Sequence, residues 1–170
     1  NDSNNGLTND AAGAFLTIQK AVDVVSAKLD MGAYAVTIQV GAGTYAESVG
    51  LNDYLGAVVP TLRGDVSTPS NVVIAATTGS AIDINTSTNW NVEGFKLTST
   101  VANGILVALS GAVNFQALEF GACASHHILA YFGASVRIIG NYRISGGAIT
   151  HFRSDSSGST IRLDGRTVTI

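Results

Sequence analysis

The sequence predicts an all-β chain folded as a parallel β-helix, a solenoid with coils of about 21–25 residues, closed at its N-terminal end by an amphipathic helix. Three observations carry this prediction: the composition, a row of short apolar segments, and apolar residues that repeat about every 23 residues. The 170 residues are 46% hydrophobic and only 12% charged, with 19 Gly and 2 Pro. This composition excludes helix bundles, coiled coils and disordered chains, and the length allows one domain.

Residues 1–33 are predicted to form an irregular lead-in followed by the capping helix. Thr17 can serve as the N-cap, and Met31 with Gly32 closes the element. The apolar residues at helical spacing are Ile18, Ala21, Val22, Val25 and Leu29. Because the end of a solenoid exposes apolar core, we expect this helix to lie across it.

Residues 34–170 are predicted to form the coils, as one structural unit. Short runs of Val, Ile, Leu, Phe and Thr are separated there by clusters of Gly, Ser, Asn and Thr. The predicted strands are 36–40, 58–62, 72–75, 81–84, 95–97, 105–108, 118–120, 128–131, 136–139, 142–144, 149–151 and 161 onward.

Two series of apolar residues set the period of the coils. The sequence numbers of the first series rise in steps of 23, 23 and 21, through Ile82, Ile105, Ile128 and Ile149. Those of the second series rise in steps of 23, 24 and 24, through Val92, Phe115, Ile139 and Leu163. A sandwich has no reason to repeat the same inward position once per coil, so the period favours a parallel β-helix.

Stacking the aligned segments predicts specific columns of side chains. The inward columns are Phe95 with Leu118 and Tyr142, and Leu97 with Phe120 and Ile144. The column between them, expected to be exposed, is Lys96, Glu119 and Arg143, which we interpret as a charge ladder that pins the register. The bends between strands are expected at the small residues Gly94 and Ala117 and, in the same column, at Asn141, which tolerates left-handed backbone.

The charge pattern and the cysteine count exclude several partners. The net charge is −3, from 9 Lys plus Arg and 12 Asp plus Glu without a run of like charge, so no nucleic-acid groove is predicted. No apolar stretch reaches the ~20 residues that span a bilayer, so no membrane span is predicted. Cys123, the single cysteine, excludes an intrachain disulfide and is interpreted as a buried core residue.

Four N-terminal segments carry a resemblance to a known family. They are Asp2-Ser3-Asn4-Asn5-Gly6-Leu7, Ala14 to Val22, Val36 to Val40, and Gly43-Thr44-Tyr45. Together they resemble the N-terminal part of pectin-lyase-like right-handed β-helix proteins. Residues 91–170 are similar to the β-helix regions of phage and prophage tail spikes and tail fibres. The resemblance implies a right-handed coil, a homotrimer, a location in a virion tail or outside the cell, and cell-surface polysaccharide as the partner.

Catalytic motifs of that superfamily are absent from the sequence. The adjacent Asp pair, the Gly-His-Gly and the Arg-x-Lys of polygalacturonase-like members do not occur. Asp65 and Asp83, separated by less than one full coil, are the nearest approach to the stacked Asp residues that bind Ca²⁺ in pectate-lyase-like members. We therefore predict no catalytic residue, metal or cofactor. The predicted function is that of a structural and adhesive module of a tail spike or tail fibre. The alternative function is a polysaccharide lyase or glycoside hydrolase with carboxylates shared across a subunit boundary, and the third possibility is a spacer that binds no ligand.

The densest polar cluster lies near the end of the sequence. The residues proposed to contact carbohydrate are His127, Tyr131, His151, Arg153 and Asp155, together with Trp90. Tyr and His rings can stack on sugars, while Arg and Asp can bond to hydroxyl groups. His127 is expected to point outward, and Trp90 suits either the core or an exposed sugar platform. The competing interpretation is a solvated coil edge. Cys123 with His126 or His127 lacks further ligands for Zn²⁺.

The two ends of the sequence carry their own expectations. Because it opens at Asn1 rather than Met, we expect a removed leader or a longer native chain. Residues 167–170 alternate like a strand without a cap, so we expect further chain or a partner there.

Overall fold

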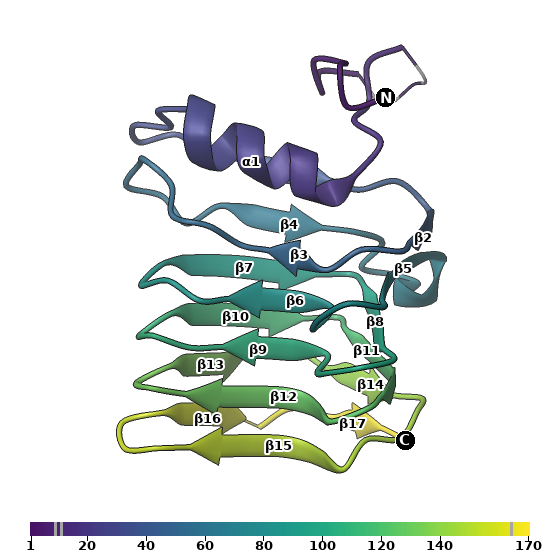
Figure 1. Ribbon diagram of the computed structural model, residues 1–170, viewed down its shortest axis with the longest axis vertical. Helices are drawn as coiled ribbons and strands as arrows, with labels where there is room; N and C mark the ends of the chain where they lie inside the picture. The colour runs from purple at the N-terminus through teal and green to yellow at the C-terminus, as the bar shows by residue number, and fades with distance from the viewer. Residues whose placement is uncertain (9, 11, 164) are drawn as a thin grey trace.

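The computed structural model describes residues 1–8, 10, 12–163 and 165–170, and confirms the predicted parallel β-solenoid with one N-terminal helix (Figure 1). Each coil contributes one strand to each of three parallel sheets, except that the last coil, β16 with β17, adds none to the third. The sheets are named here after their first strands. The β1 sheet is β1 (Thr37–Gln39), β4 (Thr61–Arg63), β7 (Asn89–Glu93), β10 (Ala112–Gln116), β13 (Ser135–Ile138) and β16 (Thr160–Leu163). The β2 sheet is β2 (Gly43–Tyr45), β5 (Val72–Ala76), β8 (Lys96–Ser99), β11 (Glu119–Cys123), β14 (Tyr142–Ile144) and β17 (Val168–Thr169). The β3 sheet is β3 (Val49–Gly50), β6 (Ile82–Ile84), β9 (Ile105–Val107), β12 (His126–Tyr131) and β15 (Thr150–Asp155).

Most of the repeating apolar residues form the core, but three members of the predicted series do not match: Ile149, Ile139 and Leu163, the last of which is 41% exposed. Ile82, Ile105 and Ile128 are register partners as predicted, but the next partner is Phe152, and Ile149 is 73% exposed. The coil that runs from Ile128 to its partner Phe152 is longer than predicted. The predicted step therefore stops short, at Ile149, just before β15 begins. In the other series Phe115 pairs with Ile138 rather than Ile139.

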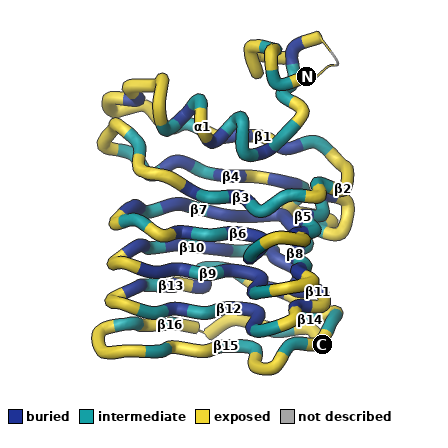
Figure 2. The backbone as a smooth tube through the Cα atoms, viewed as in Figure 1, coloured by how far each residue is buried: buried dark blue, intermediate teal, exposed yellow. Residues whose placement is uncertain are grey.

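Both predicted inward columns of the β2 sheet are confirmed. Leu97, Phe120 and Ile144 are register partners, and Phe95, Leu118 and Tyr142 are buried just before them. Edge-to-face ring contacts join these columns to the β1 sheet, with Phe115 5.8 Å from Phe120 and 6.0 Å from Tyr142. Figure 2 shows the interior strands as largely buried, while the last coil is exposed or intermediate.

The bend and the charge ladder each differ in one residue from the prediction. Gly94 and Ala117 do adopt positive φ, at 77° and 48°, whereas Asn141 does not. Lys96, Glu119 and Arg143 are register partners, with Lys96 Nζ 2.8 Å from Glu119 Oε1. The ladder is not fully exposed, however, because the Glu119 side chain is buried between its two cationic neighbours.

Helix α1 (Ile18–Lys28) covers the N-terminal end of the coils, as predicted (Figure 1). Thr17 is confirmed as the N-cap, since its hydroxyl accepts a hydrogen bond of 3.2 Å from the Lys20 amide. The buried helix residues, all part of the main core, are Ile18, Val22 and Val25. Within the described part of the chain, no helix is long and apolar enough to cross a membrane.

Two side chains fasten this helix to the first coil. The Glu47 carboxylate accepts hydrogen bonds from the amides of Ile18 (2.9 Å) and Gln19 (3.0 Å), two donors that a helix start leaves without partners. The Gln19 carboxamide pairs with the backbone of Gly50 in β3, accepting from its N–H at 2.7 Å and donating to its carbonyl at 3.1 Å. The helix is therefore held by directional bonds as well as by apolar burial.

Candidate functional site

The structure brings Tyr131, Arg153 and Asp155 together on the outer face of the β3 sheet. Ile128 and Ala130 of β12 point into the core, so the alternation of the strand directs Tyr131 outward. Tyr131 is the register partner of Asp155 in β15. Asp155 in turn pairs with Arg153, Nε to Oδ2 at 2.7 Å, and both side chains are about half exposed.

Phe132, which follows Tyr131, extends this face around the turn. Its ring centroid lies 4.5 Å from that of Tyr131, and the side chain is 57% exposed. Leu109, one coil earlier, is 53% exposed. Both residues have left-handed backbone, with φ of 53° for Phe132 and 54° for Leu109. We call Leu109, Tyr131 and Phe132 the apolar edge.

The apolar edge is held in place at an energetic cost. A bulky residue at positive φ costs about 1–3 kcal/mol, and exposed side chains recover little of it by burial. Hydrogen bonds from the neighbouring coils fix the turn. The Phe132 carbonyl accepts from the Ser110 amide at 2.9 Å, its amide donates to Ser156 Oγ at 2.7 Å, and the Gly133 amide donates to Ser159 Oγ at 3.2 Å.

His127 and His151 do not belong to this outer face, which corrects the predicted patch. His127 is buried and stacks on Phe120 of the core, with centroids 5.4 Å apart. His151 contacts the same Phe120 ring edge-on, at 5.5 Å. The alternation that predicted an outward His127 fails because His126, His127 and Ile128 lie at the corner where the chain enters β12, and all three are buried.

The two histidines form a hydrogen-bonded chain whose donors can be assigned in order. The Gly121 carbonyl, 3.0 Å from His127 Nε2, can only accept, so that nitrogen carries the proton and Nδ1 of the neutral ring accepts. His151 Nδ1, 2.8 Å away, is then the donor, and His151 Nε2 accepts from the Tyr142 hydroxyl at 3.1 Å. Every ring nitrogen is satisfied while both histidines are neutral.

Burial keeps these histidines neutral. It lowers the pKa of His151 to about 4, and the neighbouring His127 adds to the effect. Burial also lowers the pKa of His127, although the carbonyls of Gly121 and Gly147 act in the opposite direction. The chain is therefore a structural element, and a solvent-borne sugar has no direct access to His127.

His126, although buried, contacts residues of the outer face, where His127 was expected. Its Nδ1 lies 2.8 Å from the Thr150 hydroxyl, and its Nε2 lies 3.4 Å from a terminal nitrogen of Arg153. The imidazole thus supports the Arg153–Asp155 pair from behind. The adjacent histidines consequently serve opposite faces of one strand, which the repeat of the sequence does not reveal.

Trp90, the remaining predicted site residue, lies in the core and offers no sugar platform. The side chain is fully buried, its Nε1 donates to the Asn52 carbonyl at 3.0 Å, and Tyr54 packs edge-on at 5.8 Å. Cys123 is buried as predicted, and this burial raises the pKa of its thiol to about 11.

Among the described carboxylates, Asp83 and Asp155 on the outer face of the β3 sheet lie too far apart for the pair that glycoside hydrolysis needs. Asp83 lies on the outer face of the β3 sheet, where burial raises its pKa, but three strand spacings, about 14 Å, separate β6 from Asp155 in β15. Glu93 is buried between Arg63 and Gln116. Over the described ranges, no group of three or more His, Cys, Asp or Glu could hold a metal ion.

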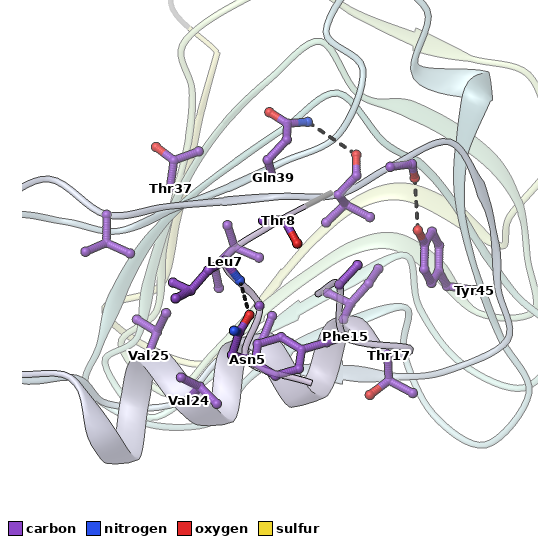
Figure 3. A pocket seen from close by; sticks show the side chains of 18 of the residues that line it. Asn5, Leu7, Thr8, Phe15, Thr17, Val24, Val25, Thr37, Gln39 and Tyr45 are labelled. Carbon is purple, nitrogen blue, oxygen red and sulfur yellow. Dashed lines mark hydrogen bonds between the residues drawn. The ribbon is translucent and has the colours of Figure 1, made fainter. Parts of the chain in front are cut away.

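A separate groove lies at the N-terminal end, between the lead-in, α1 and β1, with a volume of about 530 Å³ (Figure 3). Apolar side chains such as Leu7, Val24 and Val25 line it. Two of its polar side chains are engaged with backbone: the Tyr45 hydroxyl donates to the Gly41 carbonyl at 3.0 Å and the Gln39 amide donates to nearby carbonyls. The groove therefore presents no reactive constellation.

Phe132 and Leu109 are members of the site that were not predicted from the sequence. A signal for them exists, because these two apolar residues stand one coil apart and each lies in a Gly-containing turn, Leu109-Ser110-Gly111 and Phe132-Gly133.

Comparisons with known proteins identify the fold. No protein-family model and no curated protein sequence matches the chain. The deglycosylated pectin methylesterase of Aspergillus niger matches with a TM-score of 0.55 and 17% identity, over 94% of this chain and 64% of that one. A second structure of that enzyme, with one N-acetylglucosamine stub, gives a TM-score of 0.53. This chain thus spans 64% of the length of the structures it matches. The chain has a parallel β-helix fold similar in structure to that of the fungal pectin methylesterase.

Proposed function

We propose that the chain is a carbohydrate-binding β-helix module, in which the apolar edge and the Arg153–Asp155 pair contact a polysaccharide. The observation that carries the proposal is the exposed Phe132, held against Tyr131 on left-handed backbone. Strain of this kind persists where the surroundings impose it, and it concentrates at functional sites.

The chemistry of the face suits sugars. The C–H faces of a pyranose ring pack on aromatic side chains such as Tyr131 and Phe132, while its hydroxyl groups need donors and acceptors at the same level. Arg153 supplies donors and Asp155 supplies acceptors, and their mutual ion pair holds both side chains ready. The strand face is open, which suits a long chain better than a small ligand.

The assembly and location that the sequence predicts are part of the same proposal. A structural and adhesive role in a homotrimeric phage or prophage tail spike or fibre, in a virion tail or outside the cell, rests on the resemblance of residues 91–170. The alternative function, a depolymerase of the lyase or hydrolase type, would need a second carboxylate brought to Asp83 or Asp155 by another subunit.

Binding to an array of bacterial polysaccharides tests the proposal, with wild type beside Phe132→Gly. Glycine is unstrained at this φ, so we expect Phe132→Gly to unfold at the same or a higher temperature and yet to bind at least about fivefold more weakly. Tyr34→Ala is the matched control, because Tyr34 is an exposed aromatic residue far from the edge. Equal binding by wild type and Phe132→Gly would refute the proposal, and release of new reducing or unsaturated ends would favour the depolymerase.

A further inference from the structure

Positive charge is concentrated in the last coils of the chain. Residues 137–170 contain five arginines and two aspartates, whereas residues 1–136 contain four Lys or Arg and ten Asp or Glu. The two parts therefore carry net charges of +3 and −6, although the whole chain is acidic. The solenoid brings three of these five arginines, Arg137, Arg162 and Arg166, close to one another.

Arg137 and Arg162 lie side by side on the outer face of the β1 sheet. They are register partners in β13 and β16, and both side chains are exposed while Val136 and Ile138 point into the core. Adjacent strands are about 4.8 Å apart. Like charges directly opposite one another destabilise a sheet. The fold thus holds two guanidinium groups together at a cost.

Arg166 adds a third guanidinium at the same edge. Its Nε donates to the Ile138 carbonyl, which follows Arg137 directly, at 3.4 Å. Arg137, Arg162 and Arg166 form no ion pair with any residue that the structure describes.

The other cations of the coils behave differently. Each of them forms an ion pair with a described carboxylate; they are Arg63, Lys96, Arg143 and Arg153. Among the coil residues that the structure describes, the three unpaired arginines are therefore exceptional, and their positive charge is free to meet an external anion.

The surroundings of the arginines favour a glycan over a nucleic acid. The same outward column continues toward the N-terminus as Asn114, Asn91 and Thr61, whose side chains are linked by hydrogen bonds of 3.0 and 3.4 Å. A linear polymer along the solenoid axis would meet neutral amides and then guanidinium groups. This column offers no aromatic ring on which a base could stack. Three arginines in an acidic chain are also too few to bind the many phosphates of a nucleic acid.

We propose that Arg137, Arg162 and Arg166 form a binding site for the acidic groups of an anionic polysaccharide, carboxylate or sulfate. Guanidinium groups bind either anion through two parallel N–H bonds. This inference rests on the proposed function, because it takes the ligand to be a polysaccharide. The site lies on a different sheet from the apolar edge, so the two can fail separately.

Calorimetry with alginate, dextran sulfate and neutral dextran tests this site. We expect wild type to bind alginate or dextran sulfate, more weakly as salt rises, and not dextran. The paired substitution Arg137→Gln and Arg162→Gln should weaken this binding about tenfold or more without lowering the unfolding temperature. The two acidic polymers distinguish carboxylate from sulfate as the preferred group.

The matched control removes two charges elsewhere, as Lys20→Gln with Lys28→Gln on α1, and should bind like wild type. Binding of neither acidic polymer, an equal loss in the control, or tighter binding of duplex DNA would overturn the inference. A loss in Phe132→Gly but not in the arginine variant would overturn this site and leave the proposed function standing. A loss in the arginine variant but not in Phe132→Gly would support this site and count against the apolar edge.

Discussion

The buried chain of His127, His151 and Tyr142 should make the fold sensitive to mild acid. The pKa of His151 is about 4 in the folded state against an ordinary value of 6.5, so the unfolded chain takes up a proton that the folded chain refuses. Stability should be level above about pH 6.5, fall as the pH drops from there toward 4, and then level again for this group.

The size of the effect follows from the two pKa values. At pH 5 a group with pKa 6.5 unfolded and about 4 folded would lower the free energy of unfolding by about 2 kcal/mol relative to pH 7. His151 is partly exposed, so screening by solvent reduces this to about 1 kcal/mol. His151→Gln should abolish this contribution, because a carboxamide can donate to His127 and accept from Tyr142 without titrating.

Urea denaturation at pH 7 and pH 5, at constant ionic strength, measures the effect through the fluorescence of the buried Trp90. Wild type should lose about 1 kcal/mol more than His151→Gln between the two pH values. If both proteins lose the same amount, the histidine chain does not carry the pH dependence and the reasoning fails.

Two further substitutions test the ion contacts of the fold. Glu47→Ala should lower the free energy of unfolding by about 2 kcal/mol, because the amides of Ile18 and Gln19 lose a charged acceptor at the helix start. Thermal unfolding followed by circular dichroism measures this loss. A loss below about 0.5 kcal/mol would contradict the prediction. Lys96→Met should cost about 2–3 kcal/mol by leaving the buried Glu119 with only the longer ion pair to Arg143, and chemical denaturation should show that adding Glu119→Leu restores most of the loss. A double variant no more stable than Lys96→Met would count against this account.

The pKa of Glu119 reflects the same competition. Burial alone would raise it, but hydrogen bonds from Lys96 and Ser145 and the charges of Lys96 and Arg143 outweigh burial and hold it below the ordinary value. The carboxylate is therefore charged in the folded protein at neutral pH, which is why the loss of Lys96 matters more than for an exposed pair.

Most of the solenoid could be predicted because each coil repeats the same inward positions. Phe95, Leu118 and Tyr142 align by spacing alone, and the structure stacks them as expected. Strands whose outward residues are polar were harder to predict from the sequence. In β7 the core residues Trp90 and Val92 alternate with asparagine, which is also the commonest signal of a loop, so this strand was not predicted.

The candidate site could be predicted only in part, for a local reason. Arg153 and Asp155 stand within a regular strand, where alternation fixes the side that each residue faces. His127 stands at a corner between sheets and Phe132 in a turn, where the backbone breaks that alternation. Spacing locates such residues along the coil, but only the turn geometry decides whether they face the core or the solvent.

The pairing of Gln19 with Gly50 has a consequence for self-association. β3 is the first strand of its sheet, and a first strand normally leaves a row of backbone groups able to recruit a strand from another molecule. The Gln19 carboxamide occupies one donor and one acceptor of that row, as a neighbouring strand would. Gln19 thus satisfies the outward backbone groups of Gly50, so that a strand from another molecule cannot pair with this position of the edge.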